Sequence, residues 1–128
     1  MNNKGFSLLE ILIALIILAI GLLAIAAMQI TSIRGNFFSD NMTQASVLAQ
    51  DRLEGLRSLP FVNGNWPDAL SMGDHDDGKI PVRGLNFSRS FRVDQDPNNP
   101  ATGRRITVTI RWKDHSDHSI SFSTIRSP

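Results

Sequence analysis

An uncharged apolar run near the N-terminus limits most strongly what this 128-residue chain can fold into. Residues 11–28 read ILIALIILAIGLLAIAAM and contain no charged or strongly polar side chain. In a helix they would extend for about 27 Å, close to the ~30 Å hydrocarbon core of a bilayer. The run therefore predicts a membrane-spanning helix and leaves roughly 100 residues for one small domain beyond it.

A single carboxylate, Glu10, stands directly before this run. Such a group costs about 2.5–3.5 kcal/mol in a membrane span unless it has a partner. A cleaved signal peptide would explain Lys4 as the basic region and Ala24-Ile25-Ala26 as the cleavage site. The apolar run is, however, longer than the roughly 7–15 residues of a signal peptide. A plain transmembrane anchor fits the length but leaves Glu10 unexplained.

A third interpretation uses the whole string KGFSLLE together with the apolar run that follows it. This string resembles the N-terminus of a type IV prepilin, which has a basic leader, the junction G-F-x-x-x-E and a long apolar helix. In that family a membrane-embedded aspartyl peptidase cuts after the glycine and methylates the new α-amine. The resemblance implies cleavage between Gly5 and Phe6, N-methylation of Phe6, and retention of the apolar segment.

The resemblance also gives Glu10 an expected role in assembly. In pilins the mature α-amine of a subunit lies near this carboxylate in the filament core, where the pair sets the register of docking more than it adds stability. The implied partners are the prepilin peptidase/N-methyltransferase, other pilin subunits, the inner-membrane assembly platform and, before assembly, membrane lipid. The implied location is the bacterial inner membrane, single-pass with the head outside the cytoplasm, and then the filament.

The helical pattern continues beyond the apolar run as one stripe of an amphipathic helix. The stripe consists of Phe38, Met42, Ala45, Ala49, Leu53 and Leu56. Pro60 is expected to end the helix, because proline lacks an N–H and disfavours helix in the preceding residue. The expected organisation is a leader at 1–5, a transmembrane or filament-core helix at 6–30, an amphipathic helix at 31–59 and a β-sheet head at 60–128.

The head is expected to be a three-stranded antiparallel meander packed on the amphipathic helix, an α+β fold. Period-two alternation of apolar residues predicts strands over 85–93, 104–113 and about 119–126. Residues 61–84 are rich in Gly, Pro, Asn and Asp and are expected to form a long loop, with a short helical turn at 67–70. The chain has no cysteine, so packing alone must hold this head together.

Two polar clusters in the head are candidates for metal chemistry. Asp74, Asp76 and Asp77 place three carboxylates within four residues, but the spacing does not match a calcium-binding EF-hand loop, and a solvated turn is the favoured interpretation. His115 and His118 lack the helical spacing of a zinc protease and are expected to be exposed loop residues. No nucleophile or phosphate-binding motif is present, so we expect neither an enzyme nor a cofactor.

The charge distribution and the positions of the aromatic residues bear on whether the chain binds nucleic acid. Setting aside Lys4 and Glu10 leaves 12 basic and 11 acidic residues with their signs interspersed, which is not a basic footprint. The aromatic residues Trp66, Phe87, Phe91 and Trp112 are expected in the core, and the arginines Arg89, Arg92, Arg104, Arg105 and Arg111 on the outer face. DNA binding is therefore the less favoured alternative.

A second, shorter resemblance narrows the expected function to a minor pilin. The segment QASVLAQDRLEGLRSLPF is similar to PilV-type minor pilins, called type IV pilus modification proteins. The matching residues are Ala45, Ala49, Gln50, Leu53, Glu54, Leu56, Arg57, Pro60 and Phe61. The alternative within the class is a minor pseudopilin of a type II secretion system. The alternative from another class is a membrane-tethered ligand-binding or sensory domain that does not polymerise.

Overall fold

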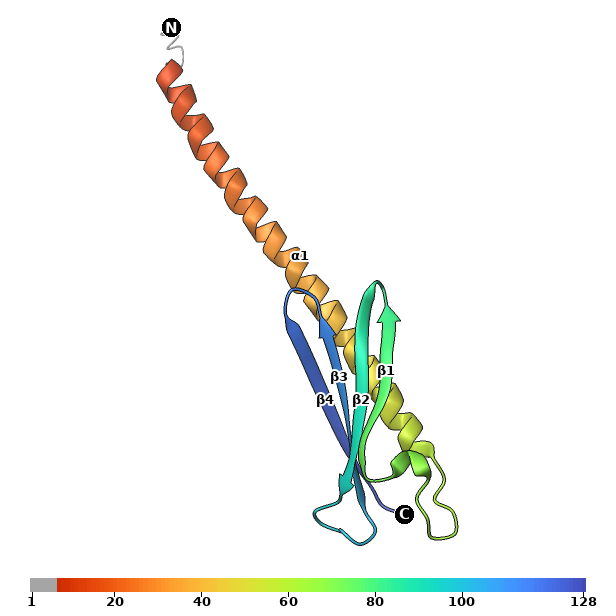
Figure 1. The fold of residues 1–128 in the computed structure, drawn as a ribbon. Coiled ribbons are helices and arrows are strands. Elements are labelled where there is room, and N and C mark those ends of the chain that lie inside the picture. Colours follow the sequence, from red (N-terminus) through yellow and green to blue (C-terminus); the bar gives the residue numbers. More distant parts are fainter. Residues whose placement is uncertain (1–6) are drawn as a thin grey trace. The chain divides into compact units, whose positions relative to one another are not determined.

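The computed structural model describes residues 7–128, and the expected leader with Gly5 and Phe6 lies outside the described residues. Along the chain it contains one long helix, a short 3-10 helix and four strands (Figure 1). Their bounds are α1 Leu8–Ser58, η1 Asp68–Leu70, β1 Gly73–Val82, β2 Leu85–Gln95, β3 Arg104–Lys113 and β4 Asp117–Arg126. The predicted α+β class is confirmed, whereas the predicted number of strands, three, is wrong. The chain divides into two compact units, Met1–Asp40 and Asn41–Pro128.

The second unit is held together by one stripe of α1 that packs on the sheet. Ala45 and Ala49 are fully buried, and Leu56 is almost so. Met42 and Leu53 are half-buried against the same core. These residues are the stripe predicted from the sequence, except that Phe38, which lies in the first unit, remains exposed. The two fully buried positions of this stripe are alanines, and the helix ends at Ser58, before Pro60 as expected.

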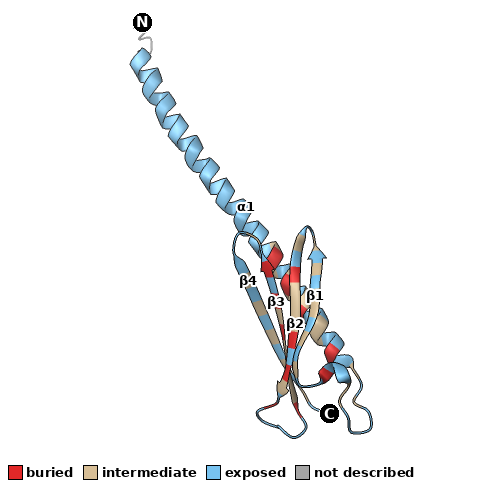
Figure 2. Ribbon diagram, in the orientation of Figure 1, coloured by how far each residue is buried: buried red, intermediate tan, exposed pale blue. Residues whose placement is uncertain are grey.

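The sheet is an antiparallel meander in the order β1-β2-β3-β4, as Figure 1 shows. Buried residues alternate along the two central strands, so one face of the sheet carries the core. These residues are Phe87, Phe91 and Val93 of β2 and Ile106, Val108, Ile110 and Trp112 of β3. Figure 2 shows the buried positions gathered on β2, on β3 and on the part of α1 beside them. The predicted strands and their inward faces are thus confirmed.

Strand β1 occupies the segment that the sequence analysis expected to be a loop. Its residues include Gly73, Gly78 and Pro81, which disfavour a central strand but are tolerated at the edge of a sheet. Between Asp76 and Gly78 the pairing with β2 shifts by one residue, which is a β-bulge, and Gly78 has a φ of 81° there. Arg83 and Gly84 then form a two-residue turn with φ values of 48° and 84°, typical of a β-hairpin.

The bulge in β1 directs Asp77 toward the helix. The Nη2 of Arg52 in α1 donates to its Oδ1 at 2.8 Å, and the Nε of Arg89 in β2 donates to its Oδ2 at 2.9 Å. The Asp77 side chain is only 14% exposed, so solvent screens these two ion pairs weakly. The expectation that Asp77 lies in a solvated turn is therefore wrong: this carboxylate joins the helix, the edge strand and the neighbouring strand.

A first prediction concerns the packing of the helix on the sheet. Ala49→Leu places extra methyl groups where the alanine is fully buried, and overpacking of this kind costs about 1–3 kcal/mol of unfolding free energy. Val47→Leu is the matched control, since Val47 is 55% exposed. Urea unfolding of the full chain in detergent, followed by tryptophan fluorescence, measures both. Equal midpoints would contradict the packing described above.

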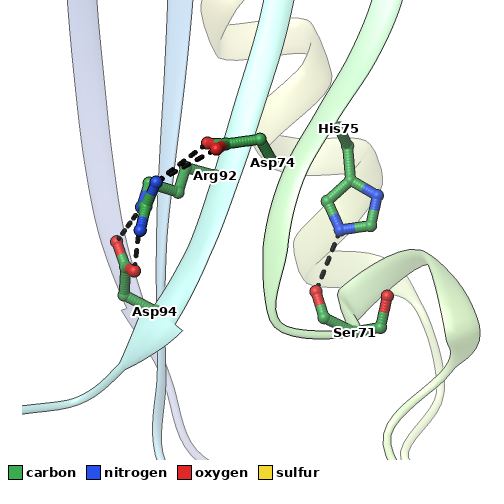
Figure 3. A network of polar contacts seen from close by, with 5 residues as sticks. All are labelled: Ser71, Asp74, His75, Arg92 and Asp94. Carbon is green, nitrogen blue, oxygen red and sulfur yellow. Dashed lines mark hydrogen bonds and ion pairs between the residues drawn. The ribbon is translucent and has the colours of Figure 1, made fainter.

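A second prediction concerns Asp77. Asp77→Asn leaves two guanidinium groups facing each other with one neutral acceptor, which should cost about 1–3 kcal/mol of unfolding free energy. Asp74→Asn is the control, because the exposed Asp74 carboxylate pairs with the exposed Arg92 at 3.1 Å (Figure 3). Exposed pairs of this type contribute about 0–1 kcal/mol. The same urea titration distinguishes them, and equal losses would show that Asp77 acts as an ordinary surface charge.

Candidate functional site

The most prominent surface of the first unit is the apolar part of α1. Its large hydrophobic side chains from Leu8 to Ile33 are all exposed, including Leu8 at 88% and Leu23 at 72%. We call this surface, residues 8–33 of α1, the apolar helix surface. By length and composition α1 is long and apolar enough to cross a membrane, and none of its most apolar window is buried. Figure 2 shows this part of the helix exposed along its whole length.

Glu10 lies in the first turn of α1, at the helix end that the sequence places before the apolar run. Ser7 caps this end: its Oγ accepts from the backbone N–H of Leu9 at 3.3 Å, and its carbonyl accepts from the N–H of Glu10 at 2.9 Å. A serine followed three residues later by a glutamate is the capping-box sequence. The helix cap is thus a second reason for a carboxylate here, beyond the expected role in assembly, and the helix dipole also favours it.

The charge of Glu10 is isolated along the helix. The next charged residue of α1 is Arg34, 24 positions farther along the sequence. At about 1.5 Å per residue this corresponds to roughly 36 Å of helix, far beyond the reach of an ion pair. Within α1, therefore, no cationic side chain lies within reach of Glu10.

The three carboxylates that were weighed as metal ligands do not converge. Asp77 faces α1, whereas Asp74 is exposed and pairs with Arg92. Asp76 accepts from the backbone N–H of Gly78 at 2.8 Å and so stabilises the bulge. Within residues 7–128 no three His, Asp or Glu side chains are grouped closely enough to hold a metal ion.

An exposed network of polar contacts lies where β1 begins and β2 ends (Figure 3). Arg92 bridges Asp74 in β1 and Asp94 in its own strand, with its Nε 3.0 Å from Asp94. Hydrogen bonding to Asp94, followed by the charge of Asp74, raises the pKa of Arg92 above its usual value. His75 contacts the carbonyl of Ser71 at 2.9 Å and stacks on Phe91 with ring centroids 4.5 Å apart. These contacts fix the start of β1 against β2 and against the turn that contains Ser71.

The two histidines of the β3–β4 hairpin have different environments. His115 lies in the exposed loop, as expected, whereas His118 belongs to β4 and stacks on Trp112 with a centroid distance of 5.3 Å. The expectation that His118 is an exposed loop residue is therefore wrong. Its Nε2 lies 3.0 Å from Asp114. Hydrogen bonds to the Asp114 carboxylate lower its pKa: the largest effect comes from the backbone N–H of Ser116, followed by the backbone N–H of His115 and the ring of His118. These contacts make Asp114 the residue that organises the turn.

The aromatic side chains form the core, as the sequence analysis favoured. Phe87, Phe91 and Trp112 are buried, and Trp66 packs against the core from the preceding loop. The expectation that all five arginines lie on the outer face is wrong for two of them. Arg89 binds Asp77 on the helix side, and the guanidinium of Arg104 lies 5.6 Å from the centroid of Trp66. No basic aromatic platform for nucleic acid results on the described part of the head.

Comparisons with known proteins agree with the position of the apolar helix. A family model described as the prokaryotic N-terminal methylation motif matches residues 1–26. The chain is 27% identical over 128 residues to the type II secretion system protein I of Xanthomonas campestris pv. campestris, a match that covers 98% of this chain and 91% of that protein. No solved structure matches the chain significantly.

The matched motif and the structure agree on where the apolar part of α1 lies and where the head begins. The methylation motif covers the N-terminal residues and most of the apolar helix surface, and the rest of α1 packs on an antiparallel sheet. The secretion protein is similar over nearly the whole chain, including the head. The prepilin-type N-terminus, the long apolar helix and the helix-on-sheet head are together consistent with a type IV pilin-like protein.

Proposed function

We propose that the chain is a minor, non-enzymatic structural subunit of a pilin-class filament. The observation that carries this proposal is the apolar helix surface, an exposed hydrophobic helix with one carboxylate at its start. Exposed apolar side chains along such a length need either lipid or other apolar helices around them. Lipid would cover them while the subunit waits in the inner membrane with its head outside the cytoplasm, and neighbouring helices would cover them in the filament.

The proposed processing links Glu10 to assembly. Cleavage after Gly5 creates a new α-amine on Phe6, which the same prepilin peptidase then methylates. That amine lies four residues before Glu10 in sequence and would be the nearest cation that the chain itself supplies. An ammonium from the same chain or a neighbouring one would offset the cost of the carboxylate only in a docked arrangement, so the pair would set the register of the subunit.

The filament that we favour is a type II secretion pseudopilus, since a protein of such a system is similar over almost the whole chain. A type IV pilus is the second candidate, and the similarity of residues 44–61 to PilV-type minor pilins supports it. Deletion of the gene separates the two. Loss of secreted proteins from the medium with intact surface pili supports the pseudopilus, whereas loss of pili with normal secretion supports the pilus.

The third prediction is the chemical state of the mature N-terminus. Mass spectrometry of the protein purified from its own membranes should find N-methylphenylalanine at Phe6 and no residues 1–5. In a strain without the prepilin peptidase, the full leader should remain. An intact Met1 in the wild-type strain, or a start near Ala27, would contradict the proposed processing.

The fourth prediction separates the charge of Glu10 from its place in the helix cap. Glu10→Gln keeps a side chain that completes a capping box but removes the charge, so the variant should insert in the membrane and be poorly incorporated into filaments. Ser7→Ala removes the capping hydroxyl, keeps the charge and should assemble nearly normally. Sheared filament fractions are compared with membrane fractions by immunoblot. Normal assembly of Glu10→Gln would contradict the docking role.

A further inference from the structure

The outer face of the head sheet, which points away from α1, carries a straight row of polar residues across all four strands. Lys79 of β1 pairs with Ser88 of β2, Ser88 pairs with Arg111 of β3, and Arg111 pairs with Ser119 of β4. We call these four residues the basic row, and they line one open hollow. At the usual strand spacing the backbones of Lys79 and Arg111 lie roughly 10 Å apart, with only a small serine between them. Two long basic side chains can therefore converge on anionic groups above Ser88.

The charges of Lys79 and Arg111 are not neutralised within the chain. Both residues are exposed, and among the described residues 7–128 neither side chain makes an ion pair. The outer face carries seven other charged residues, four acidic and three basic: Asp74, Asp76, Arg92, Asp94, Arg105, Lys113 and Asp117. Arg92 and its two aspartates pair with one another, as do Lys113 and Asp117 at 3.7 Å. Asp76 accepts from the backbone of Gly78, and Arg105 lies far from the row, opposite Asp94. The basic row therefore keeps a local positive charge.

The exposed side of α1 in the head carries the opposite charge. Asp51 and Glu54 are exposed, stand three residues apart and make no ion pair within the described part of the chain. We call them the acidic pair. The other charged residues of α1 from Asn41 on are Arg52, which binds Asp77, and the exposed Arg57, which follows the acidic pair. Because α1 packs on the inner face of the sheet, the acidic pair and the basic row lie on opposite sides of the head.

The acidic pair and the basic row also lie at similar heights along the head. Arg52, the neighbour of Asp51, donates to Asp77 at 2.8 Å, and Asp77 precedes Lys79 by two residues. A second head placed beside the first by translation, without being turned over, therefore brings its acidic pair to the basic row. Such a translation leaves α1 of both copies pointing in the same direction, as two subunits in one membrane require.

We infer that the basic row of one head binds the acidic pair of a second copy of this chain, with the two heads side by side and their helices parallel. The outer face has no aromatic residue on which a base could stack, so carboxylates fit it better than nucleic acid. Exposed ion pairs are individually weak, and confinement of both copies to one membrane raises their effective concentration. The inference rests on the proposed membrane location of α1 and not on which filament the subunit serves.

The fifth prediction tests this contact with the full chain, which has no native cysteine. One tagged form carries Gln50→Cys, one turn before Glu54, and a second carries Ser88→Cys in the basic row. Both are reconstituted together in phosphatidylcholine liposomes and oxidised, and a disulfide should join the two tags. The matched control replaces Ser88→Cys by Asn98→Cys, in the exposed loop after β2. The first combination should cross-link several-fold more than the control.

Two outcomes of the disulfide experiment would contradict different statements. Equal yields from the two combinations, or disulfides only between identical tags, would overturn the side-by-side contact. Flotation of the liposomes shows separately whether the chain is bound to lipid. A chain that does not float with the lipid would contradict the proposed membrane location, and with it this inference.

A charge exchange tests the partners directly. Asp51→Lys with Glu54→Lys in the Gln50→Cys form places like charges against the basic row, which should lower the disulfide yield by roughly five- to thirtyfold. Lys79→Glu with Arg111→Glu in the Ser88→Cys form should lower it similarly. Combining both exchanged forms opposes unlike charges again and should restore the yield. Failure of the combination to restore it would overturn the assigned partners, even if each exchange alone lowers the yield.

Discussion

The head depends on the contact between one narrow stripe of α1 and one face of the sheet. Ala45, Ala49 and Leu56 are the helix side of that contact, and the inward residues of β2 and β3 are the other side. The chain has no cysteine, so no disulfide supports this small core. The edge strand is tied to it by the ion pairs of Asp77 with Arg52 and Arg89. Removing close packing or that carboxylate therefore affects the whole head.

The same helix serves two different environments. From Asn41 on, one stripe is apolar and buried, whereas residues 11–28 are apolar on every side and exposed. A helix that is hydrophobic all round needs an apolar surrounding, either lipid or other helices. Exchange of one surrounding for the other costs little hydrophobic free energy, because both exclude water. That balance explains how a pilin-like subunit could move between membrane and filament, and in the proposed assembly the charge of Glu10 sets the register.

Burial was predicted correctly where apolar residues recur at a regular spacing. The edge strand β1, which has no such regular spacing, was not predicted. The stripe of α1 and the alternation in β2 and β3 follow repeats of 3.6 and 2 residues, so burial could be predicted from the chain alone. Strand β1 was missed because Gly78, Pro81 and three aspartates are typical of loops. An edge strand tolerates them, since one side of its backbone needs no partner. Asp77 is directed toward Arg52 and Arg89 by the bulge in β1, and no local sequence pattern predicts that bulge.

The sequence by itself determined the prepilin-type N-terminus, the long helix and the inward faces of three strands, because each depends on residues close together in the chain. The tertiary structure decided which charges are structural and which strands form the edges of the sheet. Arg52, Asp77 and Arg89 lie 25 and 12 residues apart and meet only when helix, bulge and sheet are in place. Likewise β1 and β4 are the two edge strands of the described sheet only because the meander begins and ends with them, and β1 carries a bulge and a proline.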